Sequence, residues 1–115
     1  MSKALTERPY ETIASNVTAS TATYAVIGSV IDARTASSLA LTVVNASQTI
    51  SFKVEAANQP DFDDVVEVKA EADILAGAVG TYAVAPAPYA YYRVQIKDKV
   101  GGTHGSAVLT AIVKG

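Results

Sequence analysis

Residues 50–56 read ISFKVEA, and their alternation of apolar and polar side chains decides the fold. Successive side chains of a β-strand point to opposite faces, so such a strand places one set toward the core and the other toward water. The inward set is Ile50, Phe52, Val54 and Ala56, and the outward set is Ser51, Lys53 and Glu55. The stretch therefore predicts an antiparallel strand with one buried face.

The same period of two recurs along the chain. Residues 66–72 (VEVKAEA) and 92–97 (YRVQIK) alternate in the same way, with opposite charges that can pair across strands. Weaker strands are expected at residues 10–17, 24–31 and 80–85. Turn residues separate these segments, and only residues 70–78 have a composition that allows a short helical turn. We predict an all-β fold, an antiparallel β-sandwich of about eight strands with Ig-like or jelly-roll connections.

Two further strands are apolar on both faces. They are residues 38–44 (SLALTVV) and residues 107–113 (AVLTAIV). Strands that are covered on both sides are almost continuously hydrophobic, so we expect both of these to be covered on two sides. The second strand is also a candidate contact surface for a neighbouring subunit.

Composition limits the class of protein. The chain has 115 residues, of which 50% are hydrophobic and 17% charged, and this favours one folded domain with a single core. We expect an extended N-terminal arm at residues 1–9 and a sandwich domain at residues 10–115. The net charge of −2 argues against a nucleic-acid partner, and no apolar run approaches the length of a membrane span. The start lacks the apolar core of a secretory signal, so we expect a protein made in the cytoplasm and not secreted.

The residues give little support for catalysis or metal binding. A hydrolase triad needs an imidazole, and the single histidine, His104, follows two glycines in a turn, which favours a solvated side chain. Residues 61–64 (DFDD) offer oxygen ligands without the glycine and distant glutamate of an EF-hand loop, so we expect a solvated loop with Phe62 under the sheet. The chain has no cysteine, which excludes disulfides and thiolate sites. We predict a protein that is not an enzyme and has no catalytic residue, metal or cofactor.

The most aromatic stretch is residues 86–92, PAPYAYY. Alternation with Val94 places Tyr92 in the core and leaves Tyr91 on the outward face. A tyrosine has an apolar body and a polar tip, which suits a protein interface or a platform for stacking sugars. Tyr89 and Tyr91 are therefore candidate contact residues.

Four runs of the sequence form a pattern: VIDAR at 30–34, SLALTVVN at 38–45, a strand ending AAN at 56–58 with DF after it, and AYYRVQI at 90–96. Together these runs resemble the small β-sandwich structural proteins of tailed bacteriophages. The resemblance covers residues 23–113. It implies a virion component, most simply a capsid decoration or cement protein that binds and stabilises the assembled shell.

The resemblance also implies partners and a location. The partners would be the major capsid protein or other virion subunits, with self-association that favours a trimer, and the location would be the virion, assembled in the host cytoplasm. Neither nucleic acid nor membrane is an expected partner. The alternatives are a module of a phage tail, baseplate or fibre, or a carbohydrate-binding, adhesin-like domain. The candidate partner-binding residues are Leu5, Pro9, Tyr10, Tyr89, Tyr91, Leu109 and Val113.

Overall fold

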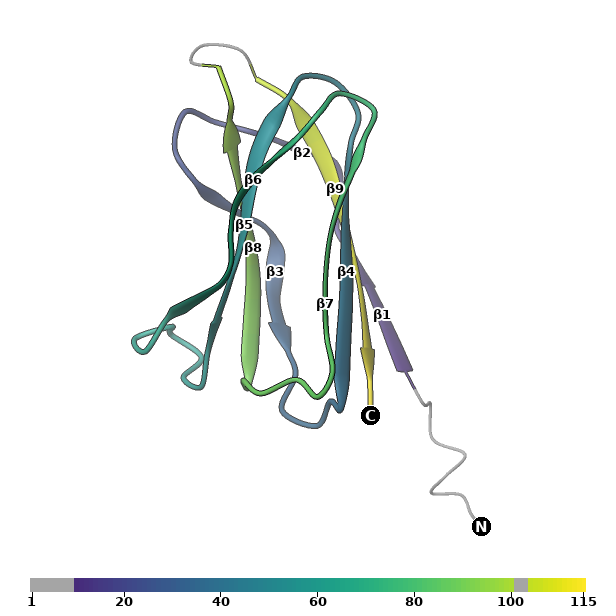
Figure 1. The fold of residues 1–115 in the computed structure, drawn as a ribbon, viewed down its shortest axis with the longest axis vertical. Helices are drawn as coiled ribbons and strands as arrows, with labels where there is room; N and C mark the ends of the chain where they lie inside the picture. Colours follow the sequence, from purple (N-terminus) through teal and green to yellow (C-terminus); the bar gives the residue numbers. More distant parts are fainter. Residues whose placement is uncertain (1–9, 101–103) are drawn as a thin grey trace.

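The computed structural model describes residues 10–100 and 104–115, and this part of the chain consists of β-strands without a helix. The strands are β1 (Tyr10–Ala14), β2 (Thr18–Ala19), β3 (Ala25–Asp32), β4 (Ser38–Asn45), β5 (Ile50–Ala57), β6 (Val66–Ile74), β7 (Val79–Val84), β8 (Tyr91–Asp98) and β9 (Ser106–Lys114). They form two antiparallel sheets that face each other (Figure 1). The predicted all-β sandwich is confirmed, while the predicted arm at residues 1–9 lies outside the described residues.

The strand order identifies the connections as those of a jelly roll. Sheet A has the order β1-β9-β4-β7, with β2 also paired to β9, and sheet B has the order β3-β8-β5-β6. Thus the first strand segments pair with the last strand, β3 with β8, β4 with β7, and β5 with β6. This is one long antiparallel hairpin rolled up so that alternate pairs enter different sheets, the architecture of a double-sheet jelly roll. Of the two predicted types of connection, the structure adopts this one.

The core is the layer between the sheets. Leu39, Leu41 and Val43 of β4 point inward from sheet A, and Phe52 and Val54 of β5 point inward from sheet B. The predicted inward set of β5 is buried in full. Each aliphatic side chain of this kind contributes about 1.5–3 kcal/mol when it leaves water, so the two inner faces supply most of the stabilisation.

The structure corrects two details of strand β6. Its pairing with β5 shifts register twice, between Phe52 and Val54 and again between Val54 and Glu55. A bulge adds a residue on one strand and so interrupts the alternation of faces, which leaves Ala70 exposed although the pattern predicted it inward. Val66 is exposed as well, although it pairs with the buried Ala56, because it lies at the start of this edge strand. No helical turn forms over residues 70–78, because β6 continues to Ile74 and a turn with Gly77 at positive φ follows.

The apolar strands β4 and β9 are covered on one side only by the described part of the chain. Their inward residues are buried, but Ala40 and Val44 of β4 are exposed on the other side, and Ile112 of β9 is half-exposed there. The prediction that both faces are covered is therefore wrong for the single chain. A two-layer sandwich has no third layer to lie on the outer face of sheet A.

Leu41 and Val44 point to opposite faces of β4, so truncating each side chain tests which face is buried. Leu41 is 1% exposed, so we expect Leu41→Ala to lower the free energy of unfolding by about 2–5 kcal/mol because a cavity remains in the core. Val44 is 44% exposed, so Val44→Ala is expected to change it by less than about 1 kcal/mol. Urea denaturation of both variants measures the difference, and equal losses would contradict the assignment of faces.

Candidate functional site

The outer face of sheet A is an uncharged surface that extends over its paired strands. Cross-strand pairing places Thr42 of β4 between Thr110 of β9 and Thr81 of β7, and places Val44 between Val108 and Val79. We call this surface the uncharged face and define it as Thr12, Ala14, Ala40, Thr42, Val44, Val79, Thr81, Ala83, Val108, Thr110 and Ile112. At the described outward positions of these strands, Lys114 at one end is the only charged residue.

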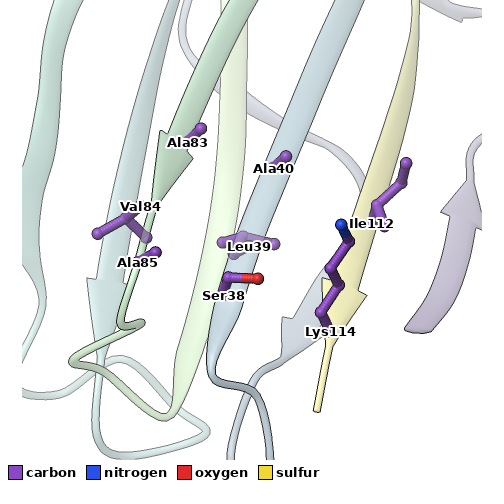
Figure 2. Close-up of a pocket in the computed structure, with 8 residues that line it drawn as sticks. All are labelled: Ser38, Leu39, Ala40, Ala83, Val84, Ala85, Ile112 and Lys114. Carbon is purple, nitrogen blue, oxygen red and sulfur yellow. The ribbon is translucent and has the colours of Figure 1, made fainter. Parts of the chain in front are cut away.

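A shallow hollow lies at the Lys114 end of the uncharged face (Figure 2). It has a volume of about 340 Å³ and is lined by Ser38, Leu39, Ala40, Ala83, Val84, Ala85, Ile112 and Lys114. The hollow exists because Ala40 and Ala83 are paired across β4 and β7, and two alanines leave space that larger side chains would fill. Such a hollow can accept an apolar side chain of a partner.

The outer face of sheet B is charged instead. Arg93 of β8 pairs with Glu55 of β5 at 2.8 Å, Lys97 with Glu71 at 3.6 Å, and Lys99 with Asp73 at 3.2 Å. Lys53 also lies 3.4 Å from Glu55. These charges find partners within the chain and remain in contact with water, so this face needs no other molecule to cover it.

Tyr24 contacts three of the charged side chains on the outer face of sheet B. Its ring lies 4.5 Å from the Lys53 ammonium and 5.0 Å from that of Lys97, and its hydroxyl donates a 2.6 Å hydrogen bond to Glu71. Burial and the nearby Glu71 carboxylate raise the pKa of the Tyr24 phenol, while the hydrogen bond from Tyr24 lowers the pKa of Glu71. The phenol is thus a neutral donor and Glu71 is ionised near neutral pH.

The structure moves two predicted contact residues from a surface into the core. Leu109 and Val113 of β9 point between the sheets, where they are 1% and 9% exposed, and cannot line an outer surface. Their neighbours Val108, Thr110 and Ile112 occupy the outer face. For the other predicted residues at this end, Tyr10 begins β1 opposite Lys114 in the pairing register, and Leu5 and Pro9 lie outside the described residues.

The tyrosines of residues 86–92 are not among the residues of the uncharged face. Tyr92 is fully buried, as predicted, and the ring of Tyr89 meets it edge-on at 6.3 Å. Tyr91 is half-buried on the outer side of sheet B, where the Arg34 guanidinium lies 5.6 Å from its ring. Asp32 holds Arg34 with a 2.7 Å ion pair, and the bonds from Arg34 lower the pKa of Asp32.

Ser20, Asp98 and His104 lie together in an order that does not activate a nucleophile. Ser20 Oγ donates to one oxygen of the buried Asp98 carboxylate, and His104 Nδ1 lies 2.8 Å from the other oxygen. Catalytic triads place the imidazole between serine and acid so that it can take the serine proton, whereas here the acid lies between them. Ser20 Oγ also accepts a 2.7 Å hydrogen bond from the Gly105 amide. The cluster therefore joins β2, β8 and the start of β9.

In the acidic loop between β5 and β6, aspartate side chains accept hydrogen bonds from backbone amides of the same loop. Asp64 accepts hydrogen bonds from the amides of Asn58 and Gln59, and Asp61 accepts one from the amide of Asp63. Phe62, at a φ of 58°, is buried as predicted, with the Arg93 guanidinium 4.3 Å from its ring. In the described part of the chain, no three acidic or histidine side chains converge as metal ligands would. That part also contains no helix long and apolar enough to cross a membrane.

Comparison with known proteins identifies the fold. Neither a protein-family model nor a curated protein sequence matches the chain. Among solved structures, the SPBc2 prophage-derived protein YomS is similar with a TM-score of 0.60 and 10% sequence identity, over 92% of this chain and 93% of that one. A protein of the Bacillus endospore appendages, described as disulfide-linked pili, is similar with a TM-score of 0.52 and 10% identity, over 91% and 86% of the two chains. At this identity the likeness shows a shared fold.

Two variants test whether the Ser20 cluster is structural. Asp98→Ala removes the buried acceptor of Ser20, so we expect the free energy of unfolding to fall by about 1–3 kcal/mol. The His104 side chain is 61% exposed, so His104→Ala is expected to cost less than about 0.5 kcal/mol. Urea denaturation measures both changes, and a larger loss from His104→Ala than from Asp98→Ala would refute this account.

Proposed function

We propose that this chain is a non-enzymatic structural protein of a phage particle, of the capsid decoration or cement type. It binds the assembled shell through the uncharged face and stabilises the contacts between shell subunits. The observation on which this depends is the difference between the two outer faces, one charged and internally paired, the other uncharged and without a covering layer. The expected partner surface is an equally uncharged, apolar strand or loop of the major capsid protein or another virion subunit.

The composition of the uncharged face favours a protein partner over a small molecule. Threonine, valine and alanine on a pleated surface give a nearly flat area with one shallow hollow and without charged groups at its centre. Small ligands are held in deeper pockets with a few converging polar groups. A flat apolar surface gains most when a second flat surface excludes water from all of it.

The fold comparisons support a structural role without specifying it. A prophage-derived protein and an appendage protein have folds similar to this one, and jelly rolls are frequent in capsid and lectin domains. Fold alone does not determine function, so the uncharged face supplies the more specific argument. Disulfide linkage, which the appendage protein's title describes, is not available to a chain that has no cysteine. Assembly would depend on non-covalent contacts of the strands.

The absence of enzymatic activity is part of the proposal. Within residues 10–100 and 104–115, the one arrangement of serine, acid and histidine has the wrong order for proton transfer from the serine. The pocket of the uncharged face contains a lysine at its rim and otherwise serine, alanine and aliphatic residues. These groups offer an apolar contact and no base or nucleophile in a defined geometry.

A charge placed on the uncharged face tests the shell-binding role. Cells that encode this chain are lysed, and the particle fraction is collected from a density gradient. The chain is stripped from these particles, which are then mixed with purified protein. Ala40→Lys introduces an ammonium that the partner must desolvate, so we expect at least a tenfold loss of affinity, about 1.4 kcal/mol. Co-sedimentation measures the bound fraction.

The matched control is Ala70→Lys, the same change at an exposed position of β6 in sheet B. We expect its binding to remain within about twofold of the unchanged protein. If the chain is absent from every particle band, or if both lysine variants bind equally well, the proposal fails.

A second candidate function has one observation in its favour. Tyr91 remains half-exposed beside Arg34, and an aromatic ring next to a guanidinium is able to stack on a sugar of a host glycan. This would suit a module of a phage tail, baseplate or fibre, or an adhesin-like domain. Tyr89 contributes less surface, because its ring packs against Tyr92.

Tyr91→Ala distinguishes the two candidate functions. If the uncharged face binds the shell, the variant should bind particles within about twofold of the unchanged protein, because Tyr91 lies on the opposite sheet. A glycan array compares retention of the two proteins in parallel. If the array retains the unchanged protein but not Tyr91→Ala, and if neither protein binds particles, the glycan-binding role is favoured.

A further inference from the structure

A sheet edge exposes unpaired backbone amides and carbonyls, and natural proteins protect such edges from pairing with other chains. The edge at β6 bears Glu67, Lys69, Glu71 and Asp73, so an approaching strand would have to desolvate charges. The edge of sheet A beside β9 is divided between β1 and β2 by residues 15–17. The edge at β3 is bent at Gly28, where φ is 70° and the register shifts. Three of the four edges therefore have a protective feature.

The fourth edge, β7, has none of these features. Its sequence is VGTYAV, without a charge or a proline, and its six residues pair with β4 without a break in register, from Val79 opposite Val44 to Val84 opposite Leu39. Among the described residues, β4 is the only strand that pairs with β7. Short, uncharged segments of high β-propensity with one side unpaired are the usual sites of strand addition.

We propose that β7 pairs antiparallel with β7 of a second copy of this chain across a two-fold axis near Thr81. The pairing joins the two A sheets into one continuous sheet, with the uncharged faces of both copies on the same side. A two-fold axis normal to the sheet makes antiparallel pairing of identical strands self-complementary, since each residue meets the same set of partners in both copies.

The side chains favour an axis at Thr81. Residues directly opposite each other must share a face, so the axis passes through Thr81 or Tyr82 and not between them. An axis at Thr81 places Gly80 opposite Tyr82 and Val79 opposite Ala83, which pairs a large side chain with a small one in each case. An axis at Tyr82 would place the two bulky tyrosines side by side on the inner face. Two threonines at the axis introduce neither charge repulsion nor steric conflict.

A second copy fits this edge for two further reasons. Four strands spaced about 4.8 Å apart and about seven residues long at about 3.4 Å each give a projected area of about 450 Å². A standard interface buries about 800 Å² on each partner, so one uncharged face is small, whereas two joined faces, about 900 Å² together, reach that size. The β6 edges lie on the same side of the sandwich as β7 (Figure 1). Their charges disfavour pairing of the two B sheets, while the ion pairs of Glu71 with Lys97 and Asp73 with Lys99 limit the repulsion between copies that are joined through sheet A. This assembly is two-fold, in contrast to the trimer that the resemblance to phage proteins implies.

The oligomeric state of the purified chain tests the pairing. Analytical ultracentrifugation over a range of concentrations should show a monomer–dimer equilibrium for the unchanged protein. Thr81→Lys places two ammoniums at the axis and should raise the dissociation constant at least tenfold. Thr110→Lys, the same change on the same face but in the centre of the sheet, should leave it within twofold. Both threonines have solvent-accessible side chains, and thermal melts of the variants verify that they remain folded.

A single cysteine tests the register, since the chain has none of its own. Opposed residues of antiparallel strands have Cα atoms about 4.5–5.5 Å apart, which is within the range that a disulfide spans. Thr81→Cys should therefore form a covalent dimer under mild oxidation, and Thr110→Cys should remain monomeric on a non-reducing gel. A monomeric or trimeric unchanged protein, or equal loss of dimer in both lysine variants, would overturn the inference. A protein that dimerises in this way but binds no particle would refute the proposed function alone.

Discussion

The burial of two apolar sheet faces against each other is the constraint on which this structure depends. Two sheets have four faces, and mutual packing covers two of them. The remaining faces must be compatible with water or be covered by another molecule. Sheet B meets this condition with ion pairs and Tyr24 over its outer face. Sheet A presents threonine, valine and alanine, which are soluble singly but together form a surface that gains free energy when it is covered.

The jelly-roll connectivity explains why the outer face of one whole sheet is charged and that of the other is uncharged. Rolling one long hairpin sends β4 and β9 to the middle of sheet A and β5 and β8 to the middle of sheet B. The central strands determine the character of each outer face, and their sequences differ accordingly: SLALTVVN and SAVLTAIVK against ISFKVEAA and YYRVQIKD. The more exposed ion pairs, Lys97 with Glu71 and Lys99 with Asp73, are worth at most about 1 kcal/mol each, so these charges of sheet B do more to prevent association than to stabilise the fold.

The sequence predicts the fold better than it predicts the site. Where polar and apolar residues alternate, as in β5 and β8, the inward set is evident, and Phe52 and Tyr92 were assigned correctly to the core. In β9 both sets are apolar, so period two gives two faces without distinguishing the inner from the outer, and Leu109 and Val113 were assigned to a surface that they do not reach. The bulges of β6 and the bond from Ser20 to Asp98, 78 residues apart, depend on register and tertiary contact that local patterns do not encode.

Because the other three sheet edges have protective features, their absence from strand β7 is informative. If pairing with another chain were tolerated at every edge, charges, breaks and bulges would occur without regard to the edges. Instead β6, the β1 and β2 edge, and β3 each have one such protective feature. Strand β7 lacks them and borders the sheet whose outer face is also uncharged. Edge pairing joins faces, and joined faces bind a flat partner more tightly because the second contact is made without a further loss of translational freedom. In a protein without cysteine, self-association and docking can thus arise from a single unprotected edge and the surface beside it.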